Sequence, residues 1–83
     1  MENQEKMYEK VYEILADIAE CDPKDLKPTS DLQNEMGVTS LMGLEVLVEL
    51  ERNFKISLDE EVLIRMTTPK EIVEIVNEEL ENQ

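Results

Sequence analysis

Residues 37–54 read GVTSLMGLEVLVELERNF, and this stretch decides the fold. Thr39 and Ser40 are residue types that favour the start of a helix, and apolar side chains then recur at three- and four-residue steps as far as Phe54. Projected at about 100° per residue, the apolar positions cover most of the circumference. The remaining stripe is charged and consists of Glu45, Glu49 and Arg52. The pattern predicts a helix from Ser40 to Phe54 that is buried on several sides or keeps apolar surface for a ligand or partner.

The segment before this stretch predicts a helix followed by a long connection. Its apolar stripe consists of Met7, Val11, Ile14, Leu15 and Ile18. This helix should end near Glu20 or Cys21, because Asp22 precedes Pro23 and a residue before proline is pushed out of the helical region. The connection then runs to Thr39 and contains four apolar residues, Leu26, Leu32, Met36 and Val38. We interpret them as anchors of an ordered crossover, since unstructured loops of this length are uncommon.

Two helix-start signals follow the central stretch. Ser57 with Glu60 forms a capping-box pattern before a short helix, which should present Val62, Leu63 and Met66. Thr68 with Glu71 forms another, and Pro69 is at the favoured first helical position. The apolar residues of the last helix are Ile72, Val73, Ile75, Val76 and Leu80. We predict an all-α four-helix bundle with a long first loop and a short third helix, forming a single domain over residues 1–83.

The composition excludes several classes of function. The 83 residues include 8 basic and 21 acidic side chains, so the formal net charge is −13, and histidine is absent. Nucleic-acid binders concentrate Lys and Arg instead, so we expect basic protein partners and no nucleic acid. Without histidine the chain lacks the usual general base and the usual zinc ligand, and we predict neither an enzyme nor a metal site.

Cysteine content and hydropathy bear on the compartment. The single cysteine, Cys21, cannot form an intramolecular disulfide, which favours a reducing, cytoplasmic setting, and we assign this thiol no role. No run of apolar residues exceeds three, as in Val46-Leu47-Val48, whereas a membrane span needs about 20. We expect neither membrane insertion nor a signal peptide. We also expect the protein to be a monomer.

Ser40 is the residue to which chemistry could be assigned. Thr39 or Ser40 can act as an ordinary N-cap, because a hydroxyl there satisfies a free N–H group at the helix start. Ser40 has no activating base nearby in the sequence, so it is not a self-contained nucleophile. If Ser40 takes part in chemistry, another enzyme must act on it.

The Gly-x-x-Ser-Leu entrance at residues 37–41, the acidity and the helix order along nearly the whole chain resemble acyl carrier proteins. The resemblance implies that a phosphopantetheinyl transferase attaches 4′-phosphopantetheine from coenzyme A to Ser40. It also implies that acyl chains are carried as thioesters on the terminal thiol for fatty-acid or polyketide-type biosynthesis. Peptidyl and aminoacyl carriers use the same serine and bundle. A further alternative is an acidic helical adaptor in which Ser40 is only a cap.

The surroundings of Ser40 depart from the family pattern. Thr39 stands where an aspartate is usual, and Met42 stands at a position that is commonly acidic in fatty-acid carriers, whereas Glu45 and Glu51 match acidic positions of the family. Ser-Leu-Met-x-x-Glu also looks like carriers of polyketide and related specialised pathways. The resemblance implies a recognition surface for acyl-transferring and acyl-modifying enzymes with basic docking surfaces. The residues we assign to it are Thr39, Leu41, Met42, Glu45, Val46, Glu49 and Glu51, with Met42 and Val46 as its apolar centre. The wide apolar arc of this helix also suggests shelter for an acyl chain.

The net charge of −13 makes a first prediction. Because like charges on a small bundle repel one another, added salt or divalent cations should stabilise the folded state by screening. Thermal unfolding followed by circular dichroism at low and high salt should show a higher melting temperature in salt. An unchanged or lower melting temperature would contradict this expectation.

Overall fold

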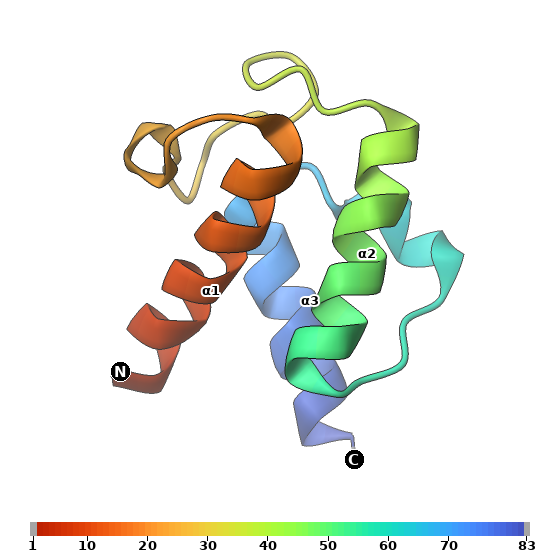
Figure 1. Ribbon diagram of the computed structural model, residues 1–83. Helices are drawn as coiled ribbons and strands as arrows, with labels where there is room; N and C mark the ends of the chain where they lie inside the picture. Colours follow the sequence, from red (N-terminus) through yellow and green to blue (C-terminus); the bar gives the residue numbers. More distant parts are fainter. Residues whose placement is uncertain (1, 83) are drawn as a thin grey trace.

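Three long helices and two short 3₁₀ helices make up the computed structural model, which describes residues 2–82 and the side chains from residue 4 onward (Figure 1). The long helices are α1 (Glu2–Ala19), α2 (Ser40–Phe54) and α3 (Pro69–Glu81). The short ones are η1 (Pro23–Asp25) and η2 (Glu60–Arg65). Residues 2–82 contain no strand, which confirms the all-α prediction. None of the helices described is long and apolar enough to cross a membrane.

The core lies between the three long helices. Each contributes side chains that are almost fully buried, such as Leu15 of α1, Leu50 of α2 and Ile72 of α3. Removing one such side chain from water contributes about 1.5–3 kcal/mol of stabilisation. The other buried apolar residues of these helices are Val11, Ile14, Ala16, Val46, Leu47, Pro69, Val73, Ile75 and Val76. The helical spacing seen in the sequence therefore does mark the inward faces, although Met7 and Ile18 of the predicted stripes lie at the edge of the core and Leu80 is exposed.

α1 ends one residue before the predicted boundary, for a reason other than Pro23. Glu20 adopts the left-handed conformation with φ 55°, and the Cys21 N–H donates to the Ala16 carbonyl at 3.0 Å. This is a Schellman cap, in which the sixth residue of the turn bonds back to the first. α2 ends in the same way, because Lys55 has φ 55° and the Ile56 N–H donates to the Glu51 carbonyl at 3.2 Å.

The long connection between α1 and α2 is tied to the start of α3. Its anchors Leu26, Leu32 and Val38 are buried, as predicted, and Met36 is half-buried against the core. The Leu32 N–H donates to the Thr67 carbonyl, and the Lys70 N–H donates to the Pro28 carbonyl, both at 3.0 Å. The Val38 N–H closes the loop by donating to the Leu32 carbonyl at 2.8 Å. The connection is thus an ordered crossover that delivers the chain to Ser40.

Of the two predicted capping boxes, one is confirmed and the other is wrong. The Thr68 hydroxyl accepts from the Glu71 N–H at 3.2 Å, so Thr68 caps α3 and Pro69 is its first residue. Ser57 does not cap the short helix, because η2 begins later, after Asp59, without a side-chain cap bond.

The reason for the later start lies in α2. The Glu51 side chain accepts a hydrogen bond from the Leu58 N–H at 2.9 Å. Both Ile56 and Leu58 are turned toward the bundle, Ile56 as a buried residue and Leu58 as a half-buried one. A tertiary contact of the segment after α2 therefore overrides the local capping signal.

Glu20 allows a test of the α1 terminus. A side chain with a Cβ costs about 1 kcal/mol in the left-handed region, and glycine avoids this cost. Glu20→Gly should therefore raise the free energy of unfolding by about 0.5–1 kcal/mol relative to Glu20→Gln, which removes the same charge but keeps the Cβ. Urea unfolding of the two variants measures the difference. Equal stability of the two would show that the cap is not strained.

Candidate functional site

Ser40 is the first residue of α2, and its side chain is exposed. The preceding residue, Thr39, is the N-cap: its hydroxyl accepts from the Met42 N–H at 3.2 Å, and its carbonyl accepts from the Gly43 N–H at 2.8 Å. The sequence left the choice of cap open between Thr39 and Ser40, and the structure assigns it to Thr39. Ser40 is consequently not needed for capping, and its hydroxyl faces solvent.

The start of α2 suits an attached phosphate ester. The N–H groups of Ser40 and Leu41 lie in the first turn, where they have no acceptor within the helix, and the helix dipole adds partial positive charge there. The first turn of α2, which is described in full, contains no acidic residue. An anion joined to the Ser40 hydroxyl would therefore meet donors and little repulsion at its point of attachment.

A small cavity of about 70 Å³ lies beside Ser40, between α2 and η2. Its lining residues are Gln33, Val38, Thr39, Ser40, Gly43, Leu63 and Met66. A Cβ added to Gly43 would lie 3.4 Å from Cδ2 of Leu63, which is ordinary van der Waals contact, so η2 packs against this part of α2 without requiring a glycine there. Sites that hold small molecules are typically about 300–1,000 Å³, so this cavity is too small to shelter an acyl chain unless η2 moves outward. The acyl shelter remains a prediction.

A bidentate ion pair joins η2 to α3. The Arg65 guanidinium donates to both carboxylate oxygens of Glu78, with N···O distances of 2.7 and 3.4 Å. The hydrogen bonding and the opposite charge of Arg65 lower the pKa of Glu78, and the same contacts with Glu78 raise the pKa of Arg65. Sequence reasoning did not find this pair, because the two residues are 13 positions apart and belong to different helices.

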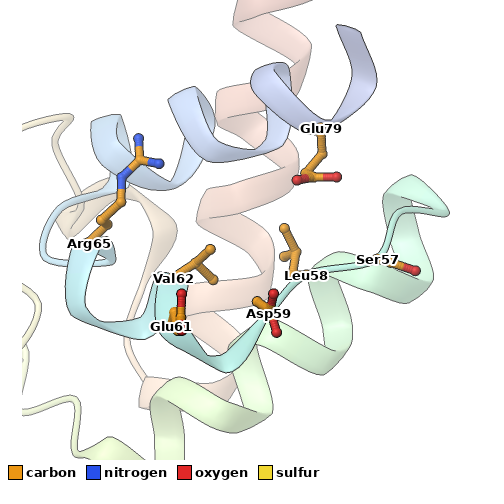
Figure 2. Close-up of a pocket in the computed structure, with 7 residues that line it drawn as sticks. All are labelled: Ser57, Leu58, Asp59, Glu61, Val62, Arg65 and Glu79. Atoms are coloured by element: carbon orange, nitrogen blue, oxygen red, sulfur yellow. The ribbon is translucent and has the colours of Figure 1, made fainter. Parts of the chain in front are cut away.

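A second hollow, of about 560 Å³, lies between η2 and α3 (Figure 2). It is lined by Ser57, Leu58, Asp59, Glu61, Val62, Arg65 and Glu79. Figure 2 shows Arg65 at one end of it and Glu79 descending from α3 at the other. Ser40 is not among its lining residues, and the hollow mixes acidic, basic and apolar groups without a common chemistry. We therefore assign it no part in the site.

The predicted recognition residues do not all lie on the surface. Leu41 is 69% exposed, and Glu45 is exposed as well. Met42 is half-buried against the core. Val46 is only 1% exposed because it faces the other helices, so its assignment to the recognition surface is wrong. The apolar side chain that does emerge further along α2 is Val48, which is 45% exposed.

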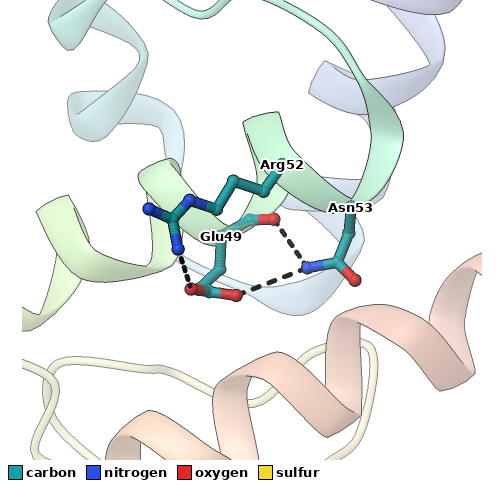
Figure 3. A network of polar contacts seen from close by, with 3 residues as sticks. All are labelled: Glu49, Arg52 and Asn53. Atoms are coloured by element: carbon teal, nitrogen blue, oxygen red, sulfur yellow. Dashed lines mark hydrogen bonds and ion pairs between the residues drawn. The ribbon is translucent and has the colours of Figure 1, made fainter.

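The remaining acidic candidates have partners within the chain. Glu51 is half-buried, and its carboxylate accepts a hydrogen bond from the Leu58 N–H, which gives this residue a structural role. Glu49 belongs to a small polar network on α2 (Figure 3). Arg52 approaches its carboxylate at 3.9 Å, and the Asn53 amide donates to its backbone carbonyl at 2.8 Å and to its carboxylate at 3.5 Å. Arg52 therefore offsets part of the negative charge on this turn.

Cys21 is half-buried and follows the end of α1. Burial raises the pKa of its thiol, and the negative charges of Asp25 and Asp22 raise it further. A raised pKa disfavours the reactive thiolate. The thiol thus has no feature that suggests a catalytic or redox role.

Comparison with known proteins identifies the family. Residues 9–76 match the family described as the phosphopantetheine attachment site, and Ser40 lies within this range. The chain belongs to the acyl carrier protein family. Carrier domains of this family bear covalently attached 4′-phosphopantetheine and work with synthase enzymes. This chain is an acyl carrier, and the exposed hydroxyl at a helix N-terminus fits the group.

Discrete carriers and carrier segments of large synthases are both similar to this chain. An acyl carrier protein of Phytoplasma mali is 25% identical over 92% of this chain and 90% of its own length. Polyketide-8 synthase acyl carrier protein 1 of Streptomyces avermitilis is 31% identical over 89% of this chain and 88% of its own. The non-reducing polyketide synthase pigA of Monascus ruber is 35% identical over 86% of this chain, which spans only 3% of that synthase.

The Arg65–Glu78 pair makes a pH-dependent contribution that can be measured. Because the pKa of Glu78 is lower in the folded state, the pair should stabilise the fold above the ordinary glutamate pKa of about 4.3, and this gain should disappear as pH falls through the lowered value. The melting temperature of Glu78→Gln should lie below that of the wild type at pH 6, and the two should converge toward pH 3. Glu81→Gln, on another exposed position of α3, is the control for loss of charge. A wild-type advantage that persisted unchanged at pH 3 would contradict the assignment.

Proposed function

We propose that Ser40 is the residue that receives 4′-phosphopantetheine, and that the carrier is not itself a catalyst. One observation supports this most directly: Ser40 is an exposed hydroxyl at the first position of α2, next to a separate N-cap and within the matched segment. None of the described side chains forms a hydrogen bond with this hydroxyl, so none is placed to activate it. Activation then belongs to the modifying transferase.

In the proposed modification the Ser40 oxygen attacks the pantetheine-bearing phosphorus of coenzyme A. The phosphoanhydride bond breaks, adenosine 3′,5′-bisphosphate leaves, and the transferase takes up the serine proton. When attached, the group supplies a terminal thiol on which an acyl group is held as a thioester. Thr39 keeps the first turn of α2 formed, and the N–H groups of that turn stabilise the phosphodiester.

We infer that the cargo belongs to fatty-acid or polyketide-type biosynthesis. Support comes from the similarity to free-standing acyl carrier proteins and to a polyketide synthase carrier of nearly the same length. An aminoacyl or peptidyl cargo would use the same serine. Comparing the acyl-loaded and aminoacyl-loaded forms as substrates of the partner enzymes distinguishes the two kinds of cargo. The adaptor alternative has no support of this kind, because it leaves the family match and the spare Ser40 hydroxyl unexplained.

The proposed partners are a phosphopantetheinyl transferase and acyl-transferring enzymes with basic docking surfaces. Leu41 and Glu45 are exposed on the two turns after Ser40, where an approaching enzyme would meet them. The other members of the proposed surface are Thr39, which is also exposed, and the half-buried Met42, Glu49 and Glu51. We further propose that the carrier acts as a cytoplasmic monomer, consistent with its strong self-repulsion.

Mass spectrometry tests the attachment site. Incubation with coenzyme A and a broad-specificity phosphopantetheinyl transferase should add one 4′-phosphopantetheine to the wild type and none to Ser40→Ala. Ser57→Ala removes another exposed serine and should be modified like the wild type. The proposal fails if several such transferases leave the wild type unmodified, or if the adduct persists in Ser40→Ala.

A further inference from the structure

A hollow of about 460 Å³ lies at the end of the bundle remote from Ser40, and we call it the distal hollow. The start of α1 and the ends of α2 and α3 surround it, at the lower end of the molecule in Figure 1. Its lining residues are Lys6, Met7, Lys10, Phe54, Asn77 and Leu80. Because Ser40 is the first residue of α2 and Phe54 is the last, about 21 Å of helix separates the two sites at 1.5 Å per residue.

The local charge of the distal hollow is opposite to that of the whole molecule. Lys6 and Lys10 line it, and none of the described residues in its lining is acidic, although the net charge of the chain is −13. By contrast, the hollow between η2 and α3 is lined by three carboxylates, those of Asp59, Glu61 and Glu79. The Debye length at physiological salt is about 8 Å, so a bound group responds mainly to the charges next to it. The distal hollow therefore favours a negatively charged ligand.

The polar groups of the distal hollow have room for such a ligand. Lys6 and Lys10 lie one helical turn apart on α1, so their ammonium groups share a face and repel each other. Neither forms an ion pair with the side chains described from residue 4 onward, and the half-buried Asn77 amide has no hydrogen bond to any of them. A carboxylate between the two lysines would relieve their repulsion, and the amide of Asn77 is a further donor.

The remainder of the distal hollow is apolar. Met7 and Phe54 are half-buried against the core, and Leu80 is 37% exposed. Each belongs to a different long helix, so an alkyl chain laid across them would remove apolar surface of all three helices from water. The volume of about 460 Å³ lies within the range of about 300–1,000 Å³ that is typical of small-molecule sites.

We propose that the distal hollow binds a free aliphatic carboxylate, with the head group at Lys6 and Lys10 and the alkyl chain over Met7, Phe54 and Leu80. A single negative charge suits this site. An acidic peptide carries several charges, and the acidic surface around the hollow would repel most of them. An aliphatic carboxylate is the hydrolysed form of the acyl cargo proposed above, but its binding here is non-covalent and does not depend on that proposal.

Nuclear magnetic resonance with decanoate, below the concentration at which it forms micelles, tests the proposal. Decanoate should shift the amide signals of residues 6–10, 53–55 and 77–80, and it should leave those of residues 39–43 and 63–66 unchanged. Decyltrimethylammonium has a chain of the same length with a positive head group, and it should bind at the distal residues at least about tenfold more weakly. Acetate, which has the head group without the chain, should also bind at least about tenfold more weakly.

Matched lysine variants separate the distal hollow from general charge attraction. Lys6→Gln combined with Lys10→Gln should weaken decanoate binding at least about fivefold, because both cationic partners of the head group are lost. Lys24→Gln combined with Lys27→Gln removes two exposed lysines of the crossover instead, and it should have little effect.

A second matched pair tests the contact with the alkyl chain. Leu80→Ser should weaken decanoate binding about threefold or more, because apolar surface of the hollow is lost. Ile64→Ser changes an apolar residue of η2 that is 83% exposed and should have little effect. Circular dichroism without ligand verifies that each variant is folded, and the lysine variants test the site independently.

Several outcomes would overturn the inference: equal binding of decanoate and decyltrimethylammonium at the distal residues, equal effects within either matched pair, or signal shifts confined to the surroundings of Ser40. Shifts at the distal residues with phosphatidylglycerol vesicles but not with decanoate would also overturn it, because they would identify a membrane contact.

The distal site and the carrier proposal can fail separately. Ser40→Ala should bind decanoate like the wild type, and the variant that lacks Lys6 and Lys10 should accept 4′-phosphopantetheine like the wild type. If decanoate binds selectively but no transferase modifies the wild type, the carrier proposal fails and the distal site stands. If Ser40 is modified but decanoate does not bind selectively, only the distal site fails.

Discussion

Burial of one side of α2 is the constraint on which the rest of the molecule depends. Val46, Leu47 and Leu50 are buried in the core, where α2 packs against α1 and η2, and the loss of these side chains would release the helix that presents Ser40. Because three buried side chains take up only part of the apolar circumference, α2 keeps Leu41 and Val48 on its surface. The same helix therefore stabilises the bundle and supplies the apolar surface around the site.

The sequence was sufficient wherever a local signal and the tertiary structure agree. The bounds of α2, the Thr68 cap and the anchors Leu26 and Leu32 were all predictable, because spacing and capping chemistry act within a few residues. The position of Ser40 at a helix start was predictable for the same reason.

Sequence reasoning failed where the outcome depends on how the helices pack against one another. Periodicity showed that α2 is apolar nearly all round, but only its neighbours decide that Val46 faces inward and Val48 outward. Likewise, Ser57 has the local pattern of a cap, yet the contact of Glu51 with the Leu58 N–H delays the helix. The contact between α2 and η2, in which Gly43 faces Leu63, was likewise not predictable, because it joins residues far apart in the sequence.

The elements that flank Ser40 are held with unequal strength. On one side the crossover loop is fixed by backbone hydrogen bonds to Thr67 and from Lys70, and by buried leucines. On the other side η2 is a six-residue 3₁₀ helix without a side-chain cap, held by Met66, by half-buried Leu63 and by a solvent-exposed ion pair to α3. Short 3₁₀ segments with few buried groups open at lower free energy than long packed helices. Any enlargement of the cavity beside Ser40 should therefore proceed through η2, because moving the loop or α2 would expose the core itself.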